Sequence, residues 1–595
     1  MINRMATVCA SIFIAMALFI AWLNPATGYE LDIYASTPLA TWLLIGASMI
    51  IGAGIILHQL FTQGYKHNRA WMLGFAVLVV ARLALLWVPY ARGYVTWGGD
   101  NITHWGMIID VLDTGHLYSE NSYPVAHSML AQVIQLTGLP IGTVTNLSTG
   151  LFSIYYLASI FLLVNVVTPW KKHLLIVLII ASFSTGFGIF LTPNGWSIIF
   201  LPFLFYLFYK KYQNPPFAIL FVTVLILYPF FHPLSSLMVA ISFGIILLVE
   251  SAVYYYQSKR ANNQLTIYIQ NNPLTAALLQ ITILIPWILS FNKFIPNIRN
   301  MWAQITAGAP SQFGRIEETL AKINMTGWNT VILYVKLYGV ATILILISVA
   351  GIILLLRRAL QKNEVPASTP LLSIGAVLMF FGFLYFLYLV GFPGMSSIGG
   401  DRHLSYLLLF APILGGYAIR ETFIIDRYKR LFATASICLL AIIPYLTFQS
   451  LYQAPYRLQP NGQITAHSIA GSEWNIENKN PAHKSACIMS PIHRYADGIM
   501  GKSAAASRPD LSSSGIIQVE DHLGYSEYDT LGEQYSEEIL LNITIKDRVI
   551  YDTVWEVVDR FNEDDFIKLA FDPSVHKLYD NNEFASYYIE PIIHT

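Results

Sequence analysis

Long apolar runs constrain the fold of this chain more than any other feature of its sequence. A helix needs about 17–25 mostly apolar residues to cross a bilayer, and thirteen runs meet or approach this length. They lie near residues 5–23, 38–60, 70–90, 141–167, 173–191, 194–209, 215–230, 233–256, 273–290, 329–356, 367–390, 403–420 and 431–450. Only 12% of the residues are charged, against about 25% in soluble domains. We therefore expect a polytopic α-helical membrane protein.

The last quarter of the chain has a different composition. Residues 452–595 contain 11 Lys or Arg and 22 Asp or Glu, whereas the remainder contains 24 and 13. A segment of about 144 residues can bury a core of its own. We expect residues 1–69 to form an extra N-terminal transmembrane hairpin, residues 70–450 to form a transmembrane domain, and residues 451–595 to form a soluble α/β domain.

Lysine and arginine residues predict the orientation, because short cytoplasmic loops are enriched in them. With Arg4 inside, the basic clusters at 66–69, 171–172, 210–211, 259–260, 357–362 and 420–430 all fall on that side. The N-terminus is then cytoplasmic, and the C-terminal domain lies outside the cell membrane. The first apolar run has no clear cleavage site, which favours an uncleaved anchor over a signal peptide.

Two polar interruptions face the outer side in this topology. One covers residues 292–328, and the other covers residues 91–140. The second begins with Trp97-Gly98-Gly99-Asp100-Asn101-Ile102-Thr103-His104 and continues into apolar segments at 102–117 and 125–136. Gly115 can end the first segment, and Tyr123-Pro124 opens the second. Because neither segment can span, we expect two juxtamembrane helices that lie in the membrane interface.

The acidic Gly99-Asp100 just after a span, followed by Tyr123-Pro124-Val125-Ala126-His127 at the second juxtamembrane helix, resembles the GT-C glycosyltransferases. The resemblance covers the layout of roughly residues 70–450. Gly28-Tyr29-Glu30 and the tail phrase Lys577-Leu578-Tyr579-Asp580-Asn581-Asn582-Glu583-Phe584 are similar to archaeal proteins of this type. The resemblance implies inverting transfer of a sugar from a polyprenyl- or dolichyl-phosphate donor to an outer acceptor. That acceptor would be a protein, as in protein glycosylation, or a lipid or glycan of the cell envelope.

The resemblance also suggests roles for individual residues. Asp100 is the expected catalytic base, although an aspartate here can equally cap a helix. Arg402 is expected to bind the lipid phosphate, the alternative being a salt bridge to Asp401. The other expected substrate contacts are His104, His127, Tyr123, His232 and His403. A divalent metal, Mg or Mn, held by Asp100 and His104 stays open as a cofactor.

Two departures from the resembled pattern matter. The Trp-Trp-Asp motif of oligosaccharyltransferases is missing, and only one acidic residue stands in the first loop. Both argue against en bloc transfer of an oligosaccharide to asparagine. A non-catalytic scaffold that anchors a surface assembly through the tail is the main alternative. A lipid-linked glycan transporter is disfavoured, because no internal repeat and no ionisable residue buried mid-span is found. We expect the protein to contact membrane lipids and to bind no nucleic acid. The sequence does not predict its oligomeric state.

Patterns in the tail predict several local structures. Residues 543–545 and 548–551 are expected to be strands, and residues 553–561 and 563–569 short helices, with Asn562 as a cap. The small, polar stretch 503–515 is expected to be a mobile loop. His493 and Asp497 are expected to form a surface pair.

Overall fold

The structure is a computed structural model. It describes residues 2–184, 191–211, 214–261, 272–292, 294–307, 311–322, 325–362, 365–396, 398–423, 429–457, 459–513, 515–519, 522–550 and 561–592.

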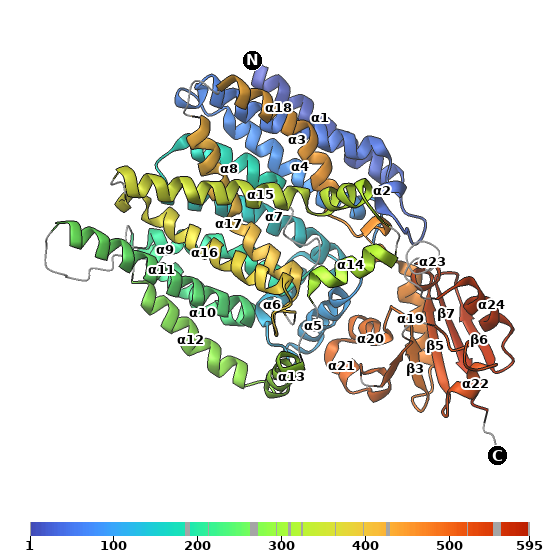
Figure 1. Ribbon diagram of the computed structural model, residues 1–595. Coiled ribbons are helices and arrows are strands. Elements are labelled where there is room, and N and C mark those ends of the chain that lie inside the picture. The colour runs from blue at the N-terminus through green and yellow to red at the C-terminus, as the bar shows by residue number, and fades with distance from the viewer. Residues whose placement is uncertain are drawn as a thin grey trace.

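A bundle of helices forms the larger part of the molecule, and a smaller α/β domain lies against one end of it (Figure 1). The helices of the bundle part are α1 (Ile2–Leu23), α2 (Ile33–Ser36), α3 (Leu39–Phe61), α4 (Trp71–Ala91), α5 (Asp100–Thr114), α6 (Pro124–Thr137), α7 (Ile141–Val167), α8 (Lys171–Phe183), α9 (Pro193–Lys210), α10 (Pro215–Phe231), α11 (Pro233–Ala261), α12 (Pro273–Leu289), α13 (Phe294–Ala307), α14 (Gln312–Lys322), α15 (Trp328–Lys362), α16 (Val365–Leu389), α17 (Gly400–Phe423) and α18 (Lys429–Gln449).

Each of the thirteen expected apolar runs overlaps a helix, although residues 185–190 of the run at 173–191 are not among the described residues. Seven helices of the described chain, in α1, α3, α4, α7, α11, α15 and α16, are long and apolar enough to cross a bilayer. A bent pair that begins with α12 would make an eighth span, and the number thirteen stays a prediction. The expected polytopic α-helical membrane body is confirmed.

Arg82 corrects the expectation that no ionisable residue is buried mid-span. It lies within α4 and is 6% exposed. Its guanidinium donates hydrogen bonds to Ser153 Oγ at 2.5 Å and to the carbonyl oxygens of Ser182 and Ser184 at 3.0 and 2.5 Å. A charged group is tolerated in an apolar bundle only when such partners are present. The carbonyls at the end of α8 supply them, which ties α8 to α4.

The two juxtamembrane helices form where the sequence predicts them. Gly115 and Gly138 end α5 and α6 in the left-handed conformation, with φ of 73° and 67°. Pro124 begins α6, where its missing N–H costs nothing. The position of α5 differs from the expectation of an interfacial helix, because nine of its residues are buried and it packs on α6, α20 and α21. It lies between the bundle and the C-terminal domain (Figure 1).

The C-terminal domain is a five-stranded mixed sheet with helices, as expected. The strand order is β4-β3-β5-β7-β6, in which β3 pairs in parallel with β4 and β5, and β7 pairs antiparallel with β5 and β6. The strands are β3 (Lys484–Cys487), β4 (Ile516–Gln518), β5 (Ile539–Thr544), β6 (Val575–Asp580) and β7 (Phe584–Ile589). The helices are α19 (Ala466–Asn478), α20 (Ile492–Met500), α21 (Lys502–Ala506), α22 (Leu531–Gln534), α23 (Ile545–Ile550) and α24 (Glu563–Phe571).

Several local predictions in this domain are settled. The helix at 563–569 and its Asn562 cap are confirmed by α24, where Asn562 and Asp565 form a capping box. The strand predicted at 548–551 is wrong, because Arg548 to Ile550 lie in α23. The loop predicted at 503–515 is wrong in part, since it contains α21 and a 3-10 turn at Pro509–Leu511. The predicted helix at 553–561 falls outside the described residues, apart from Phe561.

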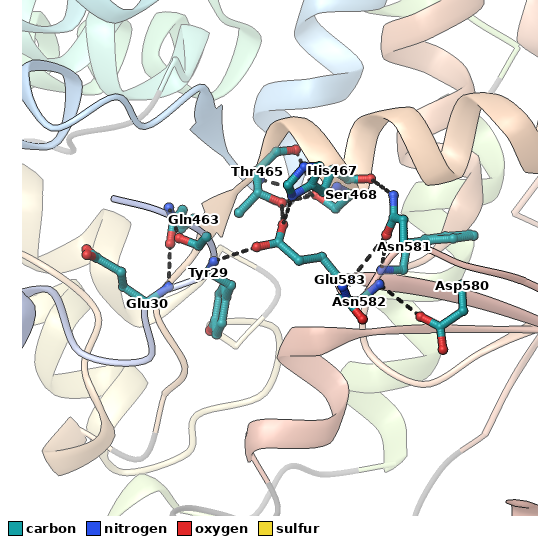
Figure 2. Close-up of polar contacts among 12 residues, drawn as sticks. Tyr29, Glu30, Gln463, Thr465, His467, Ser468, Asp580, Asn581, Asn582 and Glu583 are labelled. Atoms are coloured by element: carbon teal, nitrogen blue, oxygen red, sulfur yellow. Dashed lines mark hydrogen bonds and ion pairs between the residues drawn. The ribbon is translucent and has the colours of Figure 1, made fainter. Parts of the chain in front are cut away.

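The C-terminal domain is joined to the bundle by hydrogen bonds from the segment after α1. Glu583, in the turn before β7, accepts the N–H of Tyr29 at 2.9 Å and the hydroxyl of Thr465 (Figure 2). Gln463 accepts the N–H of Glu30 at 2.7 Å and donates to the carbonyl of Gly28 at 3.1 Å. The two phrases Gly28-Tyr29-Glu30 and Asp580-Asn581-Asn582-Glu583 therefore meet in space at this junction.

Candidate active site

Asp100 lies where the chain turns from the domain junction into α5. Strand β1 (Thr96–Trp97) pairs antiparallel with β2 (Gln463–Ile464), and the N–H of Gly98 donates to the carbonyl of Gly462 at 2.7 Å. Gly99 then turns the chain with φ of 71°, a conformation that favours glycine. Gly99 occupies the N-cap position of α5, so Asp100 is the first helical residue and not the cap.

An arginine of the C-terminal domain contacts Asp100 instead. Arg494, in the first turn of α20, places Nη2 2.8 Å from Asp100 Oδ1. Its Nη1 donates to Thr103 Oγ1 at 2.9 Å, and Thr103 Oγ1 donates to Asp497 Oδ2 at 2.8 Å. Asp497 is 3% exposed and also binds Lys502. The predicted surface pair of His493 and Asp497 is therefore wrong, because Asp497 is buried where α20 meets α5.

Asp100 and Arg494 line a cavity of about 460 Å³ between the first loop and the C-terminal domain. The side chain of Asp100 is 59% exposed, so the ion pair leaves the carboxylate open to this cavity. Lys546 also lines this cavity, together with residues that follow β3. The remaining lining residues are Gly98, Gly99, Asn101, Ile102, Thr192, Gln453, Gly462, Ile464, Met489, Ser490, Pro491 and Tyr495.

One turn along α5, a chain of hydrogen bonds links two buried imidazoles. His104 Nδ1 lies 3.0 Å from His127 Nε2, and His127 Nδ1 lies 3.0 Å from the side-chain nitrogen of Asn121. Since an amide nitrogen only donates, His127 Nδ1 accepts and Nε2 donates to His104. Burial lowers the pKa of both imidazoles, and each ring is neutral at neutral pH.

Tyr123 connects this pair to the break between α10 and α11. Its ring stacks on His232, with centroids 5.5 Å apart, and lies 5.8 Å from the rings of His104 and His127. Burial raises the pKa of Tyr123, the charge of Asp100 raises it further, and the charges of Arg402 and Arg494 lower it. The pKa of the Tyr123 phenol therefore depends on the charges of both Asp100, the candidate base, and Arg402, the candidate phosphate-binding residue. His232 Nδ1 is buried and finds no hydrogen-bond partner among the described residues.

Arg402 and His403 point to different surroundings, although they are neighbours. Arg402, in the first turn of α17, is exposed and lines a second cavity of about 390 Å³ with Tyr388, Ser396, Ile398, Gly399, Gly400 and Asp401. Within the described chain it makes no ion pair with Asp401. His403 is 3% exposed, and its Nε2 lies 3.2 Å from the carbonyl of Met395. Arg402 is thus accessible to a ligand, whereas His403 is engaged with the loop before α17.

The residues here do not fit a divalent metal. Mg and Mn prefer several oxygen ligands, but the site offers the single carboxylate of Asp100, which is paired with Arg494. His104 Nδ1 is occupied by its hydrogen bond to His127. Across the described ranges no three His, Cys, Asp or Glu residues gather as a ligand set. We derive no step through a metal.

The sequence predicted one site for the first loop, His232 and Arg402, whereas the structure places Asp100 and Arg402 in two different cavities. No sequence pattern indicated Arg494 and Lys546. Arg494 and Lys546 are isolated cations in an acidic domain, about 400 and 450 residues beyond Asp100 in the chain. Nothing in their immediate sequence distinguishes them from surface charges. Only the docking of the C-terminal domain on α5 brings them to the cavity.

No protein-family model matches the sequence, and no curated protein matches it. Three solved structures are similar in overall arrangement. The oligosaccharyltransferase of Archaeoglobus fulgidus, in complex with Zn and sulfate, is 12% identical, with 86% of this chain and 72% of that chain covered and a TM-score of 0.45. ArnT from Cupriavidus metallidurans in the apo state is 11% identical, with 87% and 98% covered and a TM-score of 0.43.

The arabinofuranosyltransferase AftD from Mycobacteria is 12% identical, with a TM-score of 0.44. The match covers 89% of this chain but only 40% of AftD. All three are GT-C glycosyltransferases.

Proposed function

We propose that this protein is a membrane glycosyltransferase that moves a sugar from a polyprenyl-phosphate donor to an extracytoplasmic acceptor, with inversion. The observation that carries the proposal is the placement of Asp100. Its carboxylate is 59% exposed and lines one cavity, and Arg402 lines a second cavity. Such a transfer needs a general base and a phosphate ligand, and we propose that Asp100 and Arg402 fill these two roles from their separate cavities.

In the proposed reaction the Asp100 carboxylate takes the proton of an acceptor hydroxyl. The acceptor oxygen forms a bond to the anomeric carbon of the sugar as the bond from that carbon to the phosphate oxygen breaks. The polyprenyl phosphate leaves with the bonding electrons, and Arg402 stabilises its negative charge. His104 and His127 are neutral, buried and hydrogen-bonded to each other, and they pack beside the ring of Tyr123.

His232 supports the phosphate side of the site. It lies between α10 and α11, where Pro233 prevents the helix from continuing. Its ring stacks on Tyr123, and its buried Nδ1 has no hydrogen-bond partner among the described residues, so this nitrogen could bond a phosphate that reached it. Burial and then the charge of Arg402 lower the pKa of His232, and we propose that the two side chains supply a hydrogen bond and a charge to one phosphate.

The experiment replaces Asp100 by asparagine in the native host and follows the glycans of its surface proteins by mass spectrometry. Loss of a positioned general base lowers the rate by roughly 10²–10⁴-fold, so the Asp100→Asn strain should lose the glycan. Asp113→Asn is the matched control, because Asp113 is an exposed carboxylate near the other end of α5. It should glycosylate normally.

Unchanged surface glycans in the Asp100→Asn strain would remove Asp100 as the base. Expression and membrane insertion of both variants are compared by immunoblot. If the glycans vanish in both strains at equal protein levels, charge on α5 and not the chemistry of Asp100 is responsible. The scaffold alternative predicts normal glycans in both.

A further inference from the structure

The cavity beside Asp100 has a wall that the proposed reaction does not use. Two cations, Arg494 and Lys546, line it, against the single carboxylate of Asp100. Both cations come from the C-terminal domain, from segments that follow β3 and β5. We propose, on the basis of the function above, that Lys546 and Arg494 bind an anionic group of the acceptor, a phosphate or a carboxylate, while its hydroxyl faces Asp100.

Sheet topology supports a binding site at this place. From β3 the chain passes to β4 on one side of β3, and then crosses to β5 on the other side. The carboxyl ends of β3 and β5 therefore flank the point where the strand order reverses, and open α/β sheets bind ligands in the crevice at such a point. Met489 to Pro491 and Lys546, which follow these two ends, line the cavity.

The two cationic segments are fixed to each other by a buried carboxylate. Asp547 is 0% exposed and accepts the N–H of Met489 at 2.9 Å and the N–H and hydroxyl of Thr544 at 2.7 Å each. With three hydrogen bonds, Asp547 links the segment after β3 to the end of β5. The wall that carries Lys546 and Arg494 is thereby held in place before any ligand arrives.

Lys546 has the properties of a ligand-binding lysine. It forms no hydrogen bond or ion pair with the residues that the structure describes, while Asp547 beside it is occupied by backbone and hydroxyl donors. Burial lowers the pKa of Lys546, and Asp547 raises it. An anion in the cavity would stabilise the ammonium form that burial disfavours. The first turn of α20, which begins after Pro491, adds the positive end of a helix dipole on the same side.

The position of the cavity separates this anion from the donor phosphate. Arg402 lines the second cavity and not the first. In an inverting displacement the acceptor approaches the sugar from the side opposite to the leaving phosphate. The base Asp100 shares its cavity with Lys546 and Arg494, so this is the acceptor side. Lys546 and Arg494 would bind the anionic group of the acceptor, and the acceptor hydroxyl would then face Asp100.

The test measures binding of inorganic phosphate to the full chain in nanodiscs of zwitterionic lipid, by isothermal titration calorimetry. Lys546→Gln should weaken phosphate binding roughly 10-fold or more, the usual effect of losing a charge-assisted hydrogen bond. Lys546→Arg should retain it. Lys568→Gln is the control, because Lys568 is an exposed lysine on α24 of the same domain that does not line the cavity. An unaltered dissociation constant in Lys546→Gln would overturn the proposal.

A second arm identifies the source of the anion with farnesyl phosphate, a soluble stand-in for the lipid donor. Arg402→Gln should weaken its binding, and Lys546→Gln should not. The opposite pattern would show that the cavity binds the donor phosphate and would overturn the acceptor assignment. Neither arm needs transfer to occur, so phosphate binding at Lys546 combined with normal glycans in Asp100→Asn would reject the proposed function alone.

Discussion

A methyl group added to Gly106 would test whether the contact between α5 and α20 builds the site. A Cβ on Gly106 would lie 2.1 Å from the carbonyl oxygen of Asp497, whereas ordinary contacts begin at 3.4 Å. The obstacle is backbone, so the two helices must separate by roughly 1 Å. Overpacking of this kind costs about 1–3 kcal/mol, against a gain of about 1 kcal/mol from alanine in a helix. We expect Gly106→Ala to loosen the docked domain.

The same separation breaks the bonds that cross this contact. Arg494 bonds both Asp100 and Thr103 over distances of 2.8 and 2.9 Å, which an added 1 Å would put beyond hydrogen-bond range. Gly106→Ala should therefore reduce transfer although it touches no reacting group. Hydrogen exchange followed by mass spectrometry should show faster exchange in α5 and α20. The exchange of α7 and α9, on the bundle side, should be unaffected.

Gly244→Ala is the matched control for this prediction. Gly244 lies in α11, and a Cβ added there meets no atom within 4 Å. Its replacement adds only the helix propensity of alanine, so its exchange and activity should equal or exceed those of the wild type. If Gly106→Ala exchanges like Gly244→Ala and transfers sugar at the wild-type rate, the close crossing of α5 and α20 does not build the site.

Two further predictions concern the histidine pair and the domain junction. Burial lowers the pKa of His104 and His127 in the folded protein. As the pH falls below 6.5, the two imidazoles are therefore protonated in the unfolded chain before they are protonated in the folded protein. Stability present above that pH should fall by up to about 1.4 kcal/mol per pH unit for each histidine, visible as a lower melting temperature at pH 5 than at pH 7. His104→Gln should flatten this dependence, and an equal slope in both proteins would contradict it. Glu583→Gln replaces a charged acceptor of two hydrogen bonds with an amide, and should cost about 1–3 kcal/mol. Faster hydrogen exchange in residues 24–32 of Glu583→Gln would show this loss of stability at the junction. Exchange at the wild-type rate in these residues would refute the prediction.

The first loop could be predicted from the sequence because its signals are local. Gly115, Gly138 and Pro124 set the ends of α5 and α6 through backbone preferences that act within one turn. The spacing of Asp100 and His104 then places both on neighbouring positions of one helix. What the sequence could not show is the burial of α5, which depends on a domain that begins about 350 residues later.

The errors have different causes. Arg548 to Ile550 have strand-forming side chains, but Asp547 accepts the N–H and hydroxyl of Thr544 and turns the chain into α23 at that point. Arg82 lies within an apolar run, and its partners are the hydroxyl of Ser153 and two backbone carbonyls at the end of α8, which no local pattern reveals. At Thr544 a local Thr-x-x-Asp capping interaction outweighs the strand propensity, whereas at Arg82 tertiary contacts supply the partners.

The location of Arg494 and Lys546 changes what a deletion of the tail can show. A scaffold that anchors a partner through residues 452–595 would lose that partner on deletion. A transferase would lose the arginine beside its base and one wall of its cavity by the same deletion. Deletion therefore abolishes function under both hypotheses. Single substitutions separate them, because Asp100→Asn removes one carboxylate while the β1–β2 pairing and the Glu583 junction stay intact. A partner retained by Asp100→Asn while the glycan is lost is the outcome that only the transferase predicts.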